Sequence, residues 1–182
     1  MTSRLGNLFH QQIVPNLKKD LNLTNDFSVP RLLKVVISAG CGRFIKDSAK
    51  VEFIYDQIMK ITGQLPVKAK AKKSVAGFAV REGMISGILV TLRKDKMYNF
   101  IDRLVYLTLP KVRDFRGIAV DAFDGNGNYN LGIKDHSVFF ESSDDFSFGM
   151  NIAFVTSAKT DQQCKSLLLG LNFPFRERAK HV

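Results

Sequence analysis

The amino-acid sequence predicts an α+β fold, in which α-helices pack on one face of a mostly antiparallel β-sheet. The first observation is a set of short apolar runs rich in β-branched residues, at 33–39, 85–92 and 150–156, each typical of a strand. The second is that segments with helical spacing of apolar residues lie between and around these runs. The third is a hydrophobic share of 45%, which suits one core. We therefore expect residues 1–182 to form a single two-layer domain.

The first element is predicted to be a helix over residues 4–21. Its apolar residues fall near one face at helical spacing: Leu5, Leu8, Phe9, Ile13 and Leu17. Pro15 lies inside this segment and should kink or split the helix, because proline lacks an amide hydrogen and its ring clashes with the preceding turn. Residues 22–30 are a polar connector that ends at Pro30.

A buried strand at 33–39 comes next, and a Gly-Cys-Gly sequence at 40–42 closes it. A helix over about 48–62 follows, and Gly63 is placed to cap its C-terminus. The residues that keep helical spacing here are Val51, Ile54, Tyr55, Ile58 and Ile61.

The segment 64–84 has a different character, because it is basic and has no stable apolar period. It predicts a short strand and then a long, basic, mobile loop over 68–84. The side chains of Lys68, Lys70 and Lys72 would point the same way in an extended chain, so that they could meet successive phosphates. Other candidates in this loop are Lys73, Ser74, Arg81 and Phe78, which could stack on a base or ribose or simply anchor the loop.

The second half of the chain begins with the strand at 85–92. Asp95 is predicted to cap a helix that runs to about Leu109, and Pro110 stops it. A charged loop follows at 111–117, and two strands are predicted over 118–140, joined by a turn at 125–128. An exposed acidic loop at 141–148 precedes the strand at 150–156. A capping box of Thr160 and Gln163 begins a last helix, which runs to about Leu169, and residues 176–182 are a basic tail.

The charge balance gives the first indication of function. Lys and Arg total 27 and Asp and Glu total 17, so the net charge is +10. A single domain this basic is expected to meet a polyanion. We favour nucleic acid over an anionic membrane, because the sequence has no run of 18 apolar residues and no dominant basic amphipathic helix. Cys41 and Cys164 lack metal-site spacing and are expected to be buried reduced thiols in a cytosol-like compartment.

No constellation of residues predicts catalysis, a metal site, a cofactor or a small-molecule substrate. His10, His136 and His181 fall in different elements and are expected at the surface. Residues 124–128 resemble the start of a calcium-binding loop, but the sixth position is Tyr129 rather than Gly, so we predict a structural turn. The adjacent carboxylates at 144 and 145 are expected to lie in a solvated loop.

A second basic cluster lies at 111–116. Lys111, Arg113 and Arg116 surround Asp114 and Phe115. Arginine side chains suit phosphate or carboxylate recognition, whereas an ion pair between Asp114 and one Arg is the alternative.

Several stretches, in one order along the chain, closely resemble the large-subunit ribosomal protein L-five family of bacteria and organelles. They are ITGQLPVKAKAKKSVAGFAVREGM at 61–84, VTLRKDKMYNF at 90–100, LPKVRDFRGI at 109–118, FDGNGNYNLGIK at 123–134 and VTSAKTDQQCKSLLLGLNFPF at 155–175. The resemblance runs from about residue 4 to 176.

The resemblance implies a non-enzymatic protein on bacterial cytoplasmic or organellar ribosomes, with an antiparallel sheet and helices on one side. It implies that the partners are 5S rRNA, large-subunit rRNA, other proteins of the central protuberance, P-site tRNA and the small-subunit head protein S-thirteen. The implied 5S rRNA surface is Ser38, Gln64 and Thr91, with Arg93 beside them. The implied tRNA-facing loop is Lys70, Lys72, Lys73, Ser74, Phe78 and Arg81, and the implied subunit bridge is Arg113, Asp114 and Arg116.

The chain departs from the family pattern at three places. Ser38 stands where the family has Asn, and a hydroxyl lacks the paired donor and acceptor of an amide. Asn126 stands where the family has Arg. The region 139–149 is shortened, and Phe148 replaces an Arg. The rivals to this reading are an enzyme that acts on RNA and an RNA-binding module that works off the ribosome.

Overall fold

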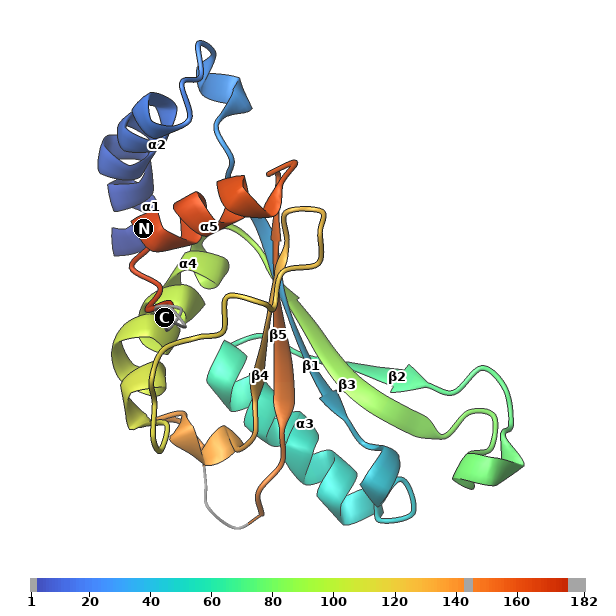
Figure 1. The fold of residues 1–182 in the computed structure, drawn as a ribbon. Coiled ribbons are helices and arrows are strands. Elements are labelled where there is room, and N and C mark those ends of the chain that lie inside the picture. The colour runs from blue at the N-terminus through green and yellow to red at the C-terminus, as the bar shows by residue number, and fades with distance from the viewer. Residues whose placement is uncertain (1–2, 143–145, 177–182) are drawn as a thin grey trace, which may run out of the picture. The chain divides into compact units, whose positions relative to one another are not determined.

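The computed structural model describes residues 3–142 and 146–176 and has an α+β architecture (Figure 1). Its main helices are α1 (Arg4–Leu8), α2 (Val14–Asp20), α3 (Ser48–Thr62), α4 (Lys94–Arg103) and α5 (Asp161–Gly170). Its strands are β1 (Leu32–Gly40), β2 (Val67–Lys70), β3 (Ile85–Leu92), β4 (Tyr129–Ile133) and β5 (Met150–Thr156). The predicted fold class is confirmed.

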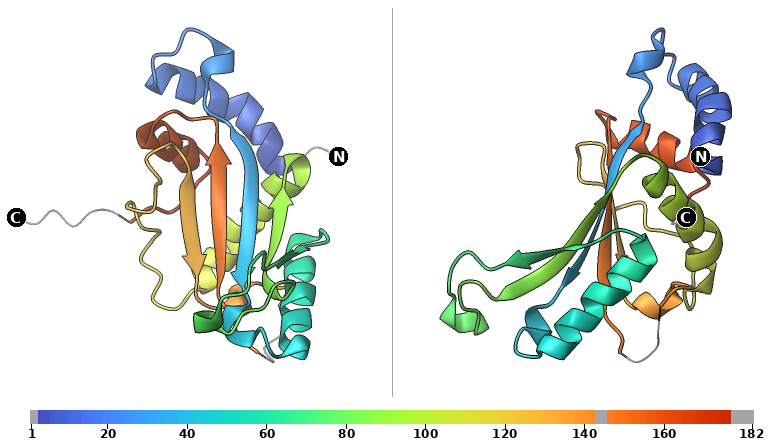
Figure 2. Two further views of the ribbon diagram at one scale, coloured as in Figure 1. Left: turned by 90° about the vertical axis from the view of Figure 1, so that its right-hand side faces the viewer. Right: turned by 180° about the vertical axis from the view of Figure 1, so that it is seen from behind.

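The strands form one sheet in the order β2-β3-β1-β5-β4, and Figure 2 shows β1, β5 and β4 side by side. Strand β2 is antiparallel to β3. The start of β3 pairs with the end of β1, through Cys41 N–H and the Ser86 carbonyl. Likewise, Ser157 N–H after β5 bonds to the Arg31 carbonyl before β1, and His136 N–H after β4 bonds to the Phe148 carbonyl before β5. Neighbouring strands are therefore antiparallel throughout.

The chain divides into two compact units. The first contains residues 1–35, 93–131 and 153–182, and the second contains 36–92 and 132–152. In the second unit α3 packs against β3. Its buried side chains include Val51, Ile54, Ile58 and Ile61, as the helical spacing predicts. Gly63 ends α3 in the left-handed conformation, with φ of 62°, which confirms the predicted cap.

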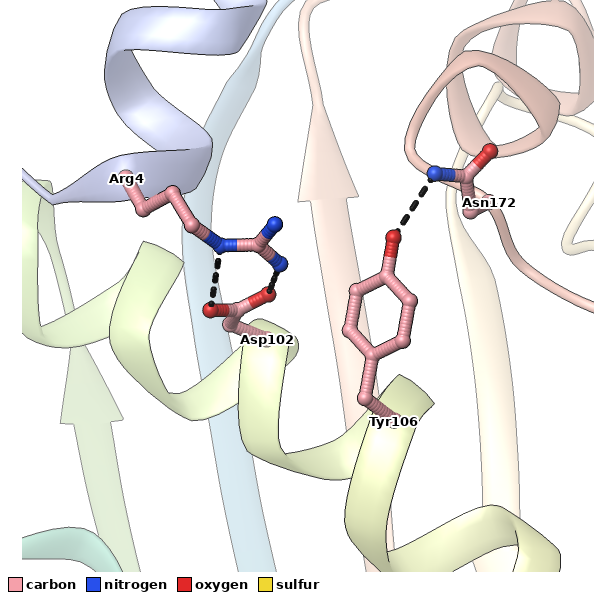
Figure 3. Close-up of polar contacts among 4 residues, drawn as sticks. All are labelled: Arg4, Asp102, Tyr106 and Asn172. Atoms are coloured by element: carbon pink, nitrogen blue, oxygen red, sulfur yellow. Dashed lines mark hydrogen bonds and ion pairs between the residues drawn. The ribbon is translucent and has the colours of Figure 1, made fainter.

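Polar side chains tie helices of the first unit together (Figure 3). Arg4 of α1 donates two hydrogen bonds to Asp102 of α4, at 2.6 and 3.3 Å, in the paired geometry that suits guanidinium and carboxylate. The Arg4 guanidinium also lies 5.2 Å from the centre of the Tyr106 ring. Asn172 donates from Nδ2 to the Tyr106 hydroxyl at 2.8 Å, which joins the end of α5 to the turn after α4.

The predicted N-terminal helix contains one irregular turn near its proline. A π-helical turn at Phe9–Ile13 lies between α1 and α2, and Pro15 lies in the first turn of α2. The backbone stays helical from Arg4 to Asp20, so the helix is not split, and the wider turn beside Pro15 is the local irregularity.

Two boundary predictions are wrong. The helix α4 begins at Lys94 with Arg93 as its N-cap residue, so Asp95 lies in the first turn and does not cap it. The predicted strand at the start of 118–140 is reduced to isolated bridges from Ile118 to Phe175 and from Phe123 to Tyr129. The reason is that Ile118 forms its backbone hydrogen bonds with residues after α5 instead of with a neighbouring strand. Its N–H donates to the Pro174 carbonyl, and its carbonyl accepts from Arg176 N–H.

Candidate nucleic-acid interface

Alternation along the central strands places Ser38 and Thr91 of the second unit on one side of the sheet, beside half-buried Val36 and Leu89. Ile37 and Ala39 of β1 are buried, and so are Val90 and Leu92 of β3. Ser38 and Thr91 lie between these pairs and are half-buried, so both side chains point to the opposite side of the sheet. On β5, Asn151 is exposed between buried Met150 and Ile152. We call the surface formed by Ser38, Thr91 and Asn151 the open face. Asn151 was missed by sequence reasoning, although the same alternation points to it.

Gln64 reaches the strand that carries Thr91. It follows the Gly63 cap of α3, and its Nε2 donates to the backbone carbonyl oxygen of Thr91 at 3.0 Å. Its backbone N–H donates to the Thr62 hydroxyl at 3.4 Å, and that hydroxyl donates to the Ile58 carbonyl. The structure thus brings Gln64 and Thr91 together, and this bond leaves one N–H and the oxygen of the amide to face a ligand.

Arg93 lies two residues beyond Thr91, in the first unit. It is exposed and directly precedes α4. Lys94 follows it with φ of 52°, in the left-handed region that side chains other than Gly rarely adopt. Both cationic side chains stand at the junction between β3 and α4, and Lys94 is exposed as well.

The basic segment is a β-hairpin and not an open loop. Strand β2 pairs with β3, and beyond it Ala71 exchanges backbone hydrogen bonds with Met84 and Gly83. Nearer the tip, Val75 and Val80 form a two-way bridge around a short turn at Ala76–Phe78. The Ser74 hydroxyl accepts from Glu82 N–H at 2.9 Å. Backbone pairing therefore organises the segment almost to its end.

Lys68 is engaged by α3, unlike the exposed Lys70 and Lys72. Lys68 is opposite Ile88 and Lys70 is opposite Ile85, and the register shift between these pairs leaves Ser86 of β3 as the extra residue. Lys68 bonds to Glu52 of α3 at 2.6 Å, and its Nζ lies 4.5 Å from the centre of the Tyr55 ring. Lys68 therefore fastens the hairpin to α3, and its ammonium group is already paired.

The rest of the hairpin presents cations and an aromatic ring to solvent. Phe78 is 78% exposed in the short turn. The exposed polar residues of this hairpin surface are Lys70, Lys72, Lys73, Ser74 and Arg81, with Glu82 as an acidic neighbour. Figure 1 shows this end of the hairpin extending away from α3. It is an arrangement that suits contact with a polyanion.

The loop that follows α4 holds Arg113, Asp114 and Arg116, and all three are exposed. Asp114 has φ of 52°, so the loop turns sharply there. Within the described parts of the chain, no ion pair joins Asp114 to either arginine. Both guanidinium groups are thus presented to an external partner.

The Asp124 turn is structural, as predicted. Asp124 Oδ1 accepts from the backbone N–H groups of Asn126 and Asn128, at 2.9 and 3.0 Å, and Oδ2 accepts from Asn128 Nδ2 at 2.7 Å. These bonds, the Asn128 side-chain bond first, lower the pKa of Asp124. The carboxylate is engaged with its own turn. In residues 3–142 and 146–176, no three His, Cys, Asp or Glu side chains gather in a way that could hold a metal ion.

One histidine prediction is wrong. His136 is fully buried and stacks on Phe148, with ring centres 4.1 Å apart and 20° between the planes. Phe148 is itself buried, so the end of the 141–148 segment packs into the second unit instead of forming a solvated loop. Asp144, Asp145 and His181 lie outside the described residues, as does the side chain of His10.

The two thiols are as predicted. Cys41 and Cys164 are both buried and free. Burial raises the pKa of both, for Cys164 to about 12, so neither is a thiolate nucleophile at neutral pH. None of the helices in the described parts of the chain has the length and apolar character to cross a bilayer.

Comparison with known proteins places this geometry in a family. The family profile for ribosomal protein L5 matches residues 25–81, and that for the ribosomal L5P family C-terminus matches residues 85–175. The chain is 49% identical over 177 residues to the large ribosomal subunit protein uL5 of Geotalea uraniireducens, covering 96% of this chain and 99% of that protein. It is 43% identical over 180 residues to the uL5 protein of Gloeothece citriformis, covering 97% and 100%.

These matches extend over nearly the whole chain and over nearly the whole of each relative. They agree with the basic composition, the antiparallel sheet and the exposed cationic hairpin. The chain belongs to the uL5 family, whose members are structural and non-enzymatic proteins of the large ribosomal subunit.

Proposed function

We propose that this protein binds 5S rRNA through the open face and helps to build the central protuberance with large-subunit rRNA and neighbouring proteins. Ser38, Gln64, Thr91 and Arg93 are assigned to that contact. Ser38 and Thr91 present hydroxyls from adjacent strands, and Gln64 lies beside Thr91 through a 3.0 Å hydrogen bond. Short polar side chains backed by a rigid sheet suit recognition of RNA shape and ribose hydroxyls.

The hairpin surface is assigned to the P-site tRNA. Lys70, Lys72, Lys73 and Arg81 supply cations, Ser74 a hydroxyl and Phe78 an exposed ring. Lys68 has a different role in this proposal, because its bond to Glu52 and its place over Tyr55 hold the base of the hairpin on α3. The hairpin can then reach tRNA while the open face remains on 5S rRNA.

The loop with Arg113, Asp114 and Arg116 is assigned to the bridge with the small-subunit head protein S-thirteen. Its two exposed arginines and one exposed carboxylate can form ion pairs with a protein partner across the subunit interface. Their lack of pairing with one another in the described chain supports this role.

The observation that carries the 5S rRNA proposal is the contact between Gln64 and the β3 backbone at Thr91. Replacing Gln64 with Ala should weaken 5S rRNA binding by about 0.5–1.5 kcal/mol, the usual value of one hydrogen bond. Filter binding at fixed salt measures this change, and urea unfolding of the same variant checks that the fold survives. An unchanged affinity would remove Gln64 from the site.

The division of labour is tested by replacing Lys70, Lys72 and Lys73 together with Ala. Binding of tRNA to the variant should weaken, and the slope of log affinity against log salt should fall by roughly 0.7–0.9 for each phosphate that is no longer neutralised. Binding of 5S rRNA should keep both its affinity and its slope. A collapse of 5S rRNA binding in a folded variant would contradict the assignment. The matched control for net charge is the replacement of Lys46, Lys60 and Lys134 together with Ala, because these three exposed lysines lie outside the assigned surfaces.

A further inference from the structure

Phe27 is the most exposed large apolar side chain in the described chain, at 93%. Tyr106, Leu107 and Leu169 expose only about half of their surface. A single exposed apolar residue is ordinary in proteins, but near-complete exposure leaves both faces of this ring in water. Packing in the described structure therefore does not account for an aromatic residue at position 27.

The backbone around Phe27 is fixed by its own turn. The Phe27 N–H donates to Asn25 Oδ1 at 2.9 Å, and Ser28 N–H donates to the Asn25 carbonyl at 3.1 Å. Val29 N–H donates to the Asp26 carbonyl at 3.3 Å, and Val29 is buried. Binding a partner through this ring costs less conformational entropy than binding through a ring on a loose loop, because the turn is already ordered.

A side-chain contact also ties the turn to α2. Lys18 Nζ lies 2.5 Å from Asp26 Oδ1, so the carboxylate next to Phe27 has a positive partner. The turn is thus held at both ends, by this ion pair and by the buried Val29 and Pro30. Figure 1 shows the connector between α2 and β1 in which Phe27 lies.

The charges around this turn favour a polyanion. Lys19 lies in the last turn of α2, and Arg31 is exposed four residues after Phe27. The Arg31 carbonyl accepts from Ser157 N–H at 2.9 Å, and Arg31 N–H donates to the Ser157 hydroxyl at 3.0 Å. These two bonds bring the segment that contains exposed Lys159 to the same end of the first unit. The acids in this region are Asp20, the paired Asp26 and Asp161, whose Oδ1 accepts from Gly127 N–H at 3.0 Å.

We propose that Phe27 is a stacking platform for an unpaired base of RNA, with Lys19, Arg31 and Lys159 near the flanking phosphates. A ring open on both faces and interleaved with cations is the arrangement that binds single-stranded nucleic acid. A protein hot spot would instead lie among other contact residues that exclude water, and the neighbours of Phe27 in the turn are the polar residues Asn25, Asp26 and Ser28. This inference rests on the proposed RNA-binding function and adds a contact to it in the first unit.

The absence of Trp from the sequence provides a clean probe. Phe27→Trp places a single indole in the full-length protein, and Phe140→Trp is the matched control at another exposed Phe. A 12-nucleotide oligoadenylate at low salt should quench the fluorescence of the Phe27→Trp protein. An RNA duplex of equal length should quench it much less, because its bases are already paired. The Phe140→Trp protein should respond equally little to both.

Affinity gives the second measurement. Phe27→Ala should weaken oligoadenylate binding by about 5–150-fold, whereas Phe27→Tyr should keep it, because base stacking is worth about 1–3 kcal/mol. Equal binding by Phe27→Ala, or equal quenching by duplex and single strand, would overturn the proposal. The proposal would also be overturned if RNA left the fluorescence of the Phe27→Trp protein unchanged while other large-subunit proteins, added without RNA, changed it. That result would favour a protein contact at Phe27. Failure of the unmodified protein to bind 5S rRNA would instead contradict the proposed function.

Discussion

Two glycines of the turn after Asp124 carry different constraints, although both have positive φ. Gly125 has φ of 84°, and a Cβ there would meet nothing within 4 Å. Gly127 has φ of 79°, and a Cβ there would lie 2.6 Å from the Ala158 carbonyl oxygen. Thr156 Oγ1 also donates to the Gly127 carbonyl at 2.6 Å, so the backbone at Gly127 is held against the segment after β5.

Gly125→Ala should therefore lower the free energy of unfolding by about 1–3 kcal/mol, which is the effect of backbone strain alone. Gly127→Ala should lower it clearly more, because the clash is with backbone that cannot rotate away. Urea unfolding of the two variants measures the difference. Equal effects would mean that the segment at Ala158 can move aside.

Single residues are where sequence reasoning reaches its limit in this protein. The strand patterns predict the side of the sheet on which Ser38 and Thr91 lie, since alternation is local. They do not predict that Lys68 pairs with Glu52, because that contact depends on how β2 lies against α3 in the folded chain. They also do not predict the burial of His136, which depends on stacking with Phe148 twelve residues away.

The Asp124 turn is an element whose stability should depend on pH. Hydrogen bonds from Asn128 and Asn126 lower the pKa of Asp124 below its ordinary value. A carboxyl with a lowered folded-state pKa contributes stability above its unfolded pKa of about 3.9, and this contribution disappears as pH falls through the folded-state pKa.

Asp124→Asn should accordingly destabilise the protein at pH 7, and the difference from the unmodified protein should shrink as the pH falls below about 4. Urea midpoints measured at several pH values give this comparison. Asp56→Asn, at an exposed carboxyl on α3, controls for the removal of one negative charge. A difference that stays constant down to a pH of about 2 would show that the charge of Asp124 does not stabilise the turn.

At the scale of elements, the sequence predicts what local periodicity determines. The helix α3 with its Gly63 cap and the strands β3 and β5 have the predicted bounds, because apolar spacing and capping residues act within a few positions. The Thr160 cap of α5 also forms, with Thr160 Oγ1 accepting from Gln163 N–H at 3.4 Å. The segment 118–123 differs because its hydrogen-bond partners at 174–176 are distant in sequence.

At the scale of the whole molecule, the chain passes between the two units four times, after residues 35, 92, 131 and 152. Three of these passages fall within strands β1, β4 and β5, and the other falls directly after β3. Unfolding one unit alone would leave β1 and β5 with half of their residues ordered and the remaining backbone groups unpaired. We therefore predict that residues 1–182 unfold in one cooperative transition, as a single domain.

The variants Phe27→Trp and Phe140→Trp report on the two units separately, because residue 27 belongs to the first and residue 140 to the second. Their fluorescence midpoints in urea should coincide with each other and with the decrease in helical circular dichroism. The same m-value should describe all three signals, since m scales with the surface exposed in a transition. Two different midpoints would contradict this prediction, especially if each transition had a smaller m-value than unfolding of the whole chain requires. The two units would then unfold independently, despite the strands that they share.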